Sequence, residues 1–412
     1  MTVKFKGYDF VDGGVCAASG FQAAGVHCGL RKNRTKPDLA LIYSETLCSA
    51  AAVYTQNKVK GAPIIVTQQN LKDNKAQAVI VNSGNANTCN LDGEEKAEMM
   101  CVAIAKELGI SANDVVVAST GIIGEPLPVE LIQAACPQLK DELNVNGNEN
   151  ASLAILTTDT CKKEVAVTFD INGVKCTLGG MAKGSGMIHP NMATMLCFLT
   201  TDVAVEPTLL QKALRDVTNE TFNMISVDGD TSTNDMVTIL ASGTALNKEI
   251  VNPNSEEYKI FANALYAVMM NLSRAIAQDG EGASKLLECT VCGANDKQIA
   301  KTVAKSVITS SLVKSAMFGQ DPNWGRILCA IGYAQADLDI NNVSVRLKST
   351  FGDVKVCKGG RGVTFDKEQV LNILRADEVK IIICVGTGDY SAVAWGCDLT
   401  YDYVKINADY HT

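Results

Sequence analysis

The first 140 residues contain several short apolar runs and one longer segment with the spacing of an amphipathic helix. The runs LALIYSE, AAVYTQ, APIIVTQ and AQAVIVN, around residues 40–90, predict β-strands separated by turns. Over residues 97–108 the apolar positions recur three and four apart. Because Gly109 closes this run, an amphipathic helix is predicted. A buried strand is predicted at 114–119, and a second helix at 128–139.

The middle of the chain predicts a hairpin followed by a glycine-rich loop. The runs EVAVTFD and GVKCTLGG alternate on either side of Asn172-Gly173, which is a strong hairpin signal. The loop GGMAKGSGMIHPNMA follows and leads into an apolar strand that begins at Thr194. Downstream we predict helices at 206–221, 255–277, 296–316 and 326–335, and strands at 236–242, 343–348, 379–385 and 391–403. Strands come in clusters with helices between them, so the pattern favours an α+β fold with layered sheets over a strictly alternating parallel fold.

Composition narrows the class of protein and of partner. The chain has 412 residues, is 47% hydrophobic and 20% charged, and carries a net charge of −8, which is typical of a globular protein of two or three domains. It has no basic cluster and only 5% aromatic residues, which argues against nucleic acid or a membrane surface as partner. No signal-peptide pattern or long apolar run is present, so we expect a cytoplasmic protein with small-molecule substrates.

Fifteen cysteines are spread from Cys16 to Cys397 without a secretory signal, and many lie inside apolar runs. We interpret most of them as reduced core residues. The single tight pair is Cys289 and Cys292, and no second pair follows at zinc-site spacing. No metal or cofactor is therefore expected.

Histidine limits the catalytic mechanisms that the chain can support. Only His27, His189 and His411 are present, and none lies in the sequence context of a Ser-His-Asp or Cys-His enzyme. The acidic segment DGDTSTND at 228–235 resembles the start of a calcium loop. That interpretation fails, because the sixth and twelfth positions are Thr233 and Ile239. The segment is then either a solvated turn or a polar wall of an active site.

The segment KGSGMIHPNMAT, residues 183–194, offers a mechanism without histidine. A threonine that opens an apolar strand is ordinarily only a β-former. Here a Gly-Ser-Gly loop and a proline precede Ala193, and cleavage before Thr194 would give that threonine a free α-amine. With an ordinary pKa of about 7.7–8.0, this amine can act as general base for the Thr194 hydroxyl. Thr120 and Gly121, at the end of a predicted strand, offer a hydroxyl and a backbone N–H for an oxyanion.

Several motifs together resemble the ornithine acetyltransferases, also called glutamate N-acetyltransferases, of arginine biosynthesis. The resemblance covers essentially the whole chain and rests on GGMAKGSGMIHPNMATML, STGIIGEPLP, TTDT, DGDTSTND, DGEGASK, DPNWGRI and YVKINADYHT. It implies a ping-pong transfer of the acetyl group from N2-acetylornithine to glutamate through an acetyl-Thr194 intermediate. Some members of that family also use acetyl-CoA, an activity that no local motif here assigns.

The resemblance also implies the roles of individual residues and the organisation of the chain. Self-cleavage between Ala193 and Thr194 would give an α chain, 1–193, and a β chain, 194–412, with tentative subdomains at 206–280 and 285–412. Two copies of each would form an α2β2 assembly on an αββα sandwich of the DmpA/ArgJ type. Thr194 would be the nucleophile, and Thr120 and Gly121 the oxyanion hole. The substrate-binding residues would be Thr157, Lys183, Thr194, Glu281, Asn407 and Thr412. Lys183 can pair with a substrate carboxylate and Glu281 with an ammonium.

Two other functions remain open at this point. A related N-terminal-nucleophile amidase or aminopeptidase would pass the acyl group to water instead of glutamate, although NADYHT and DGEGASK favour the transferase. A non-catalytic binding protein on the same scaffold would keep an intact chain.

Overall fold

The computed structural model describes residues 2–189 and 195–409 and contains two mixed β-sheets with helices, which confirms the predicted α+β class. The first sheet has nine strands in the order β1-β6-β7-β8-β10-β3-β4-β5, with β2 paired to β3. These strands are β1 (Asp9–Val11), β2 (Phe21–Val26), β3 (Leu39–Tyr54), β4 (Lys75–Asn82), β5 (Val115–Ser119), β6 (Lys163–Ile171), β7 (Val174–Lys183), β8 (Leu196–Thr201) and β10 (Met236–Ala241).

The second sheet has seven strands in the order β14-β13-β12-β15-β11-β16-β9. They are β9 (Ile225–Ser226), β11 (Leu286–Ala294), β12 (Ser344–Ser349), β13 (Gly352–Lys358), β14 (Arg361–Gly362), β15 (Glu378–Cys384) and β16 (Tyr390–Cys397). The helices are α1 (Ala62–Asn70), α2 (Gly93–Leu108), α3 (Val129–Asp141), α4 (Asn148–Ala154), α5 (Pro207–Glu220), α6 (Glu256–Gln278), α7 (Lys297–Thr309), α8 (Ser311–Phe318), α9 (Trp324–Gly332), α10 (Lys367–Leu374) and α11 (Tyr401–Asp409).

The long strand β3 folds the first sheet back on itself. Its first part pairs with β2 and β4, its last part pairs with β10, and the register with β4 shifts between Tyr43 and Cys48. The two halves of the sheet enclose one core, shared by Phe21 and Ile42 from one half and Phe198 and Met236 from the other. Burying large apolar side chains between two sheet faces stabilises such a pair of layers.

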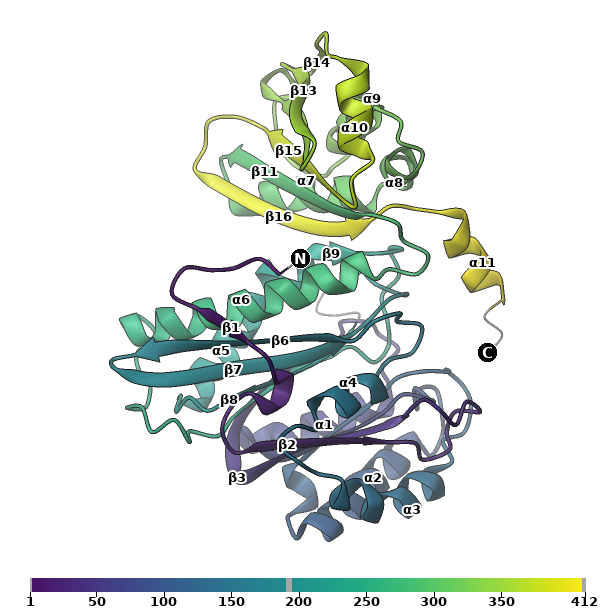
Figure 1. Cartoon of the computed structure of the whole chain (residues 1–412), viewed down its shortest axis with the longest axis vertical. Coiled ribbons are helices and arrows are strands. Elements are labelled where there is room, and N and C mark those ends of the chain that lie inside the picture. Colours follow the sequence, from purple (N-terminus) through teal and green to yellow (C-terminus); the bar gives the residue numbers. More distant parts are fainter. Residues whose placement is uncertain (1, 190–194, 410–412) are drawn as a thin grey trace.

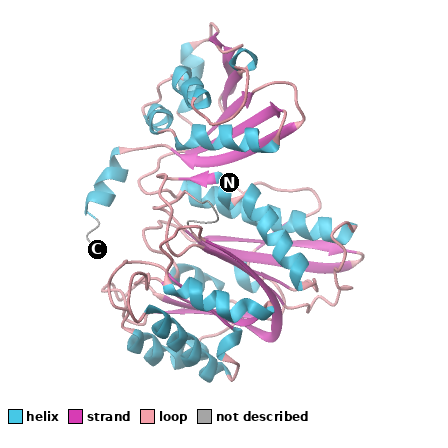
Figure 2. Cartoon of the chain, turned by 180° about the vertical axis from the view of Figure 1, so that it is seen from behind, coloured by secondary structure: helices cyan, strands magenta, loops and turns pink. Residues whose placement is uncertain are grey.

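Helices cover the two outer faces of this folded sheet. On one side α1 and α2 pack on β5, α2 also contacts β4, and α3 packs on α2, β2 and β3. On the other side α5 packs on β3, and α6 packs on β6 and β7. The result is an αββα sandwich (Figures 1 and 2), as the family resemblance implies. The second sheet, with α7 to α10, lies above α6, which also contacts β11 and β16 (Figure 1).

Helix α6 is apolar and long, yet it is a core element. Among the described residues it is the one helix whose length and composition would allow a membrane span, and 72% of its most apolar stretch is buried inside the protein. Between two sheets, an apolar surface on most sides of a helix is what burial requires.

Local sequence signals predicted several elements correctly. The hairpin β6–β7 turns at Asn172 and Gly173, whose φ angles of 53° and 84° suit the tight turn that Asn-Gly favours. Helix α2 ends at Gly109, which takes the left-handed conformation (φ 69°) expected of a C-terminal glycine.

Four predictions were wrong in detail. The runs LALIYSE and AAVYTQ, predicted as two strands separated by a turn, both contribute to the single long strand β3. The run APIIVTQ, predicted as a strand, forms α1, which begins with Pro63 in its first turn. A buried helix and a buried strand both read as a continuous apolar run, so periodicity does not separate them. The predicted helix 296–316 is broken at Ser310, whose hydroxyl caps α8. The predicted strand 391–403 ends at Cys397, and helix α11 follows from Tyr401.

Candidate active site

One cavity brings together predicted site residues that are far apart in the sequence. It has a volume of about 260 Å³. Six of the predicted residues line it: Thr120, Gly121, Thr157, Lys183, Glu281 and Asn407. The wall also includes Met195 and Leu196, with which the described chain resumes. The other predicted residues, Ala193, Thr194 and Thr412, lie outside the described residues.

Thr120 and Gly121 follow the end of β5 at the cavity wall. The Thr120 N–H donates to the carbonyl of Asn82 (3.0 Å), which continues the parallel pairing of β4 and β5 by one residue. Gly121 has a φ of 131°, and a Cβ at this position would lie 2.6 Å from the carbonyl carbon of Gly84. Only glycine fits here, because any side chain would both strain the backbone and collide with it.

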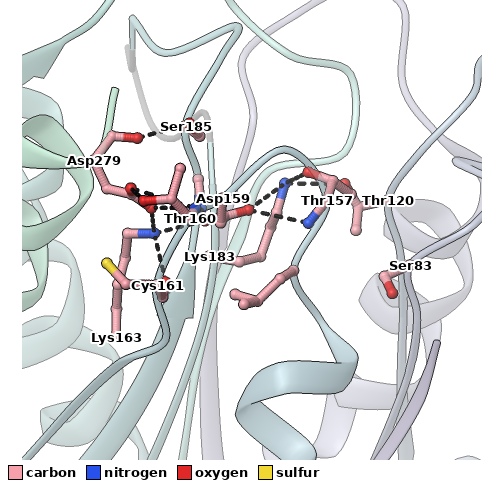
Figure 3. A network of polar contacts seen from close by, with 12 residues as sticks. Ser83, Thr120, Thr157, Asp159, Thr160, Cys161, Lys163, Lys183, Ser185 and Asp279 are labelled. Atoms are coloured by element: carbon pink, nitrogen blue, oxygen red, sulfur yellow. Dashed lines mark hydrogen bonds and ion pairs between the residues drawn. The ribbon is translucent and has the colours of Figure 1, made fainter. Parts of the chain in front are cut away.

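Lys183, the last residue of β7, is buried with 7% of its surface exposed. Its Nζ donates to the hydroxyls of Thr157 (2.7 Å) and Thr120 (3.4 Å), and lies 3.9 Å from Oδ2 of Asp159 (Figure 3). Burial lowers the pKa of Lys183, and Asp159 opposes that effect. The ammonium therefore lies inside the cavity wall with its hydrogen bonds aimed at two hydroxyls.

Glu281 and Asn407 form a second polar group on the cavity wall. The amide of Asn407, on α11, donates to Oε2 of Glu281 (2.8 Å). The Glu281 N–H donates to the carbonyl of Ser185 (3.0 Å). A Cβ on Gly186 would lie 2.3 Å from the Glu281 carboxyl, so a side chain at this position would have to displace that carboxyl.

The segment DGDTSTND forms a polar wall of the cavity, with Ser232 to Asp235 lining it. Asn234 donates to the carbonyls of Ala86 (2.5 Å) and Ser119 (3.0 Å), which attaches this wall to the end of β5. At the other end of the segment, Asp228 accepts the N–H groups of Met187 (2.7 Å) and Ile188 (2.9 Å). Asp228 thereby holds the loop that leads toward residue 190.

Neither of the two described histidines lines this cavity. His189 Nδ1 is 3.1 Å from the Ser226 hydroxyl, but Ser226 is only 1% exposed, and burial lowers the pKa of His189 to about 4. A substrate has no access to that serine. His27 Nδ1 lies 3.2 Å from the Asp38 carboxylate, and His411 is outside the described residues.

Sequence reasoning missed three buried charged residues beside the cavity: Asp159, Lys163 and Asp279. The motifs TTDT and DGEGASK contain two of them, but nothing in the sequence separates a buried carboxylate from a solvated one. Lys163 precedes an alternating strand run, where a lysine ordinarily faces water. Across residues 2–189 and 195–409, no cluster of His, Cys, Asp and Glu side chains is placed to hold a metal ion.

Comparisons with known proteins agree with the motifs. The model of the ArgJ family matches residues 22–412. The arginine biosynthesis bifunctional protein ArgJ of Caldanaerobacter subterraneus subsp. tengcongensis is 47% identical over 405 residues, covering 98% of this chain and 100% of that protein. The protein of the same name from Streptococcus mutans is 48% identical, covering 98% of this chain and 99% of that protein.

A crystal structure of the arginine biosynthesis bifunctional protein ArgJ from Bacillus halodurans is also similar, with 45% identity and a TM-score of 0.50. The match covers 53% of this chain and 100% of that one. Both the match to the family model and the identity to full-length relatives extend over nearly the whole sequence. The chain belongs to the ArgJ family.

Proposed function

We propose that the protein is a bifunctional acetyltransferase of arginine biosynthesis. It transfers the acetyl group of N2-acetylornithine to glutamate, releasing ornithine and N-acetylglutamate, and it also acetylates glutamate from acetyl-CoA. The related proteins named above carry both arginine biosynthesis and bifunctionality in their names.

The observation that carries the proposal is the convergence of six separately placed residues on one cavity. They come from the end of β5, the turn after α4, the end of β7, the turn after α6, and α11. Each of them lies in one of the family motifs STGIIGEPLP, TTDT, GGMAKGSGMIHPNMATML, DGEGASK and YVKINADYHT. An oxyanion pair, a cation and a carboxylate on one wall suit a substrate that has an acyl group, a carboxylate and an ammonium.

We further propose that the chain cleaves itself between Ala193 and Thr194, giving fragments 1–193 and 194–412. The solved Bacillus halodurans chain supports this, because it matches over its full length and yet covers 53% of this chain. The 219 residues from Thr194 to Thr412 make up that same share of the sequence.

In the first half-reaction the Thr194 hydroxyl attacks the acetamide carbonyl carbon, and the Thr194 α-amine takes its proton. The Thr120 hydroxyl and the Gly121 N–H hold the oxyanion of the tetrahedral intermediate. The C–N bond then breaks, ornithine leaves with a proton from the Thr194 ammonium, and the acetyl group remains as an ester. The glutamate amine attacks this ester and restores the hydroxyl. Lys183 pairs with a substrate carboxylate, and Glu281, Thr157, Asn407 and Thr412 complete the binding site.

The test is incubation of the purified protein with N-acetylornithine, with and without glutamate. We expect ornithine release that depends on glutamate and is matched by N-acetylglutamate. Equal ornithine release in both samples, without N-acetylglutamate, would identify an amidase that uses water. A parallel sample with acetyl-CoA and glutamate should release CoA thiol.

Three proposals concern the whole protein. The fragments assemble as α2β2. Residues 206–280 and 285–412 form subdomains of the second fragment, since β10 belongs to the first sheet, α5 and α6 pack on that sheet, and residues 286–397 supply most of the second sheet. The protein is cytoplasmic, which suits fifteen cysteines that are all free thiols.

A further inference from the structure

A buried ionic network lies directly behind Lys183. Lys163, with 2% of its surface exposed, donates to Asp159 Oδ1 (2.7 Å) and Asp279 Oδ2 (2.6 Å). Asp159 and Asp279 are 7% and 9% exposed, so all three charges are withdrawn from water. Figure 3 shows the contacts of Lys163 with the two carboxylates. Buried charges are costly unless they are paired and hydrogen-bonded, so this arrangement calls for an explanation.

Asp159 has four partners within the described part of the chain, and two of them, Thr157 and Lys183, line the cavity. Besides Lys163, its carboxylate accepts the N–H groups of Gly184 (2.7 Å) and Thr157 (3.1 Å) and lies 3.9 Å from Lys183 Nζ. Burial alone would raise the pKa of Asp159, but Lys183, Lys163 and the Gly184 N–H outweigh it and hold that pKa well below its ordinary value. Asp159 is therefore a fixed anion at neutral pH.

Asp279 extends the network to the other polar group of the cavity. Its carboxylate accepts the N–H and the hydroxyl of Thr160, and its backbone carbonyl accepts the Ser185 hydroxyl (2.6 Å). Glu281 is two residues further on and donates its N–H to Ser185. The network thus connects the turn at 157–160, the end of β7 and the turn that carries Glu281.

We propose that Asp159, supported by Lys163 and Asp279, is the positioning residue that holds the Lys183 ammonium against the hydroxyls of Thr120 and Thr157. Because the Thr120 hydroxyl accepts from Lys183, its own proton is directed elsewhere and is available to an oxyanion in the cavity. Asp159 thereby positions the Lys183 ammonium that binds substrate and, through it, orients the Thr120 hydroxyl that donates to the oxyanion. The inference rests on the proposed function.

The charges around Lys183 make the proposal testable by pH. Burial and the cations lower the pKa of Lys183, while the carboxylates raise it. The charged groups that act on it are Asp159, Lys163, Asp235 and Arg31, and Glu281 lies on the same cavity wall. Removing a carboxylate must therefore lower this pKa, and removing a neighbouring cation must raise it.

The experiment measures kcat/KM for ornithine release from N-acetylornithine against pH, in D159N, K163M and the parent protein. We expect D159N to lose about 10- to 100-fold in kcat/KM and its alkaline limb to move to lower pH. K163M should move the same limb to higher pH. The substrate titrates identically in every sample, so a difference between variants belongs to the protein.

Two matched controls separate positioning from general loosening. K162M removes the neighbouring lysine, which makes only surface pairs with Glu149 and Glu164, and D170N removes an exposed carboxylate at the far end of β6. Both should match the parent in rate and pH profile. If the substitutions only loosened the structure, the alkaline limb would move in neither D159N nor K163M, or it would move in the same direction in both.

Other outcomes overturn the proposal. They are a folded, cleaved D159N with the parent's kcat/KM and pH profile, or a K163M whose alkaline limb does not move. If D159N does not fold, we replace it with the double variant D159N/K163M, which removes both charges of the pair. The same loss of kcat/KM is expected in this variant. If the parent protein itself transfers no acetyl group, the proposed function fails, which is a different result from a parent-like D159N.

Discussion

At the scale of single residues, the site depends on side chains and backbone positions that allow little substitution. Lys183 combines burial with two hydroxyl partners, and Gly121 occupies a backbone conformation closed to other residues. The family motifs identified both residues. The surrounding Asp159–Lys163 pair was not identified, because burial comes from the packing of distant segments and leaves no mark on the local sequence.

Gly121→Ala should reduce acetyl transfer far more than Gly124→Ala. Both glycines have positive φ (131° and 83°), but a Cβ on Gly124 meets nothing within 4 Å, whereas one on Gly121 meets the Gly84 backbone. The strained backbone alone costs about 1–2 kcal/mol. We expect urea unfolding to show that cost in both variants, and acetyl transfer to be lost only in Gly121→Ala. Equal activity in the two variants would contradict the role of this turn.

Thr194→Ala should remain one intact chain and transfer no acetyl group, because it lacks the hydroxyl that we propose as nucleophile in both steps. Thr194→Ser, which keeps a hydroxyl, should still cleave and retain some activity. Mass spectrometry and the transfer assay check both variants. Cleavage of Thr194→Ala at residue 193 would show that another group is the agent.

Asp159 should also make stability depend on acid pH. Its folded pKa lies below the unfolded value of 3.8, so its contribution is fully present above about pH 4 and is lost as pH falls further. The difference in unfolding free energy between the parent and D159N should therefore be constant from pH 7 to 5 and shrink below pH 4. Urea titrations at these pH values measure it. A difference that stays constant at pH 3 would contradict the assignment.

At the scale of elements, local signals gave correct predictions where a turn or cap fixes the backbone. They failed where burial decides whether a segment forms a helix or a strand. Asn172-Gly173 specifies its hairpin directly. The run that forms α1 is apolar and rich in β-branched residues, which by itself favours a strand. Its helical conformation therefore depends on its contacts with β5 and α2. Helix α11 shows a third case, because a few polar contacts and one aromatic contact at the surface attach it to the rest of the protein, and none of its residues is buried.

Helix α11 has no buried residue. Its contacts with the rest of the protein include the Tyr403 hydroxyl to Asp228 (3.3 Å), Asn407 to Glu281, and the Tyr401 ring edge-on to Phe318 (5.5 Å between ring centroids). Just before the helix, the Thr400 hydroxyl donates to the Gly282 carbonyl (2.7 Å). Removing the last six residues should therefore lower activity much more than stability. We expect the Tm to change by less than about 2 °C, with turnover lost. Unchanged turnover would refute a role for Asn407 in the site.

At the scale of the whole molecule, the cavity exists because one sheet joins the two halves of the sequence. Strand β8 lies between β7 and β10, and β10 pairs in turn with β3. The sequence allowed layered α+β to be predicted and the resemblance implied the sandwich. The folding back of the sheet at β3, which brings β5 and β7 to one cavity, depends on long-range pairing that no local pattern shows.

The intact mass of the purified protein tests this organisation directly. We expect two species, residues 1–193 and 194–412, that elute together and in equal amounts from a size-exclusion column, because β8 and β10 are held between strands of the other fragment. A single 412-residue species after prolonged incubation would contradict self-cleavage. Fragments that separate without denaturant would contradict the shared sheet.

The insertion of β8 and β10 between β7 and β3 also changes the molecularity of folding. The uncleaved chain folds in a first-order reaction, since all strands of the sheet belong to one molecule. After cleavage, refolding from denaturant becomes a second-order encounter of two incomplete sheets with exposed edges, which are prone to aggregate. Recovery of cleaved protein should fall on dilution, whereas that of uncleaved Thr194→Ala should not. The uncleaved chain would then fold efficiently, whereas the cleaved protein, once denatured, would refold poorly.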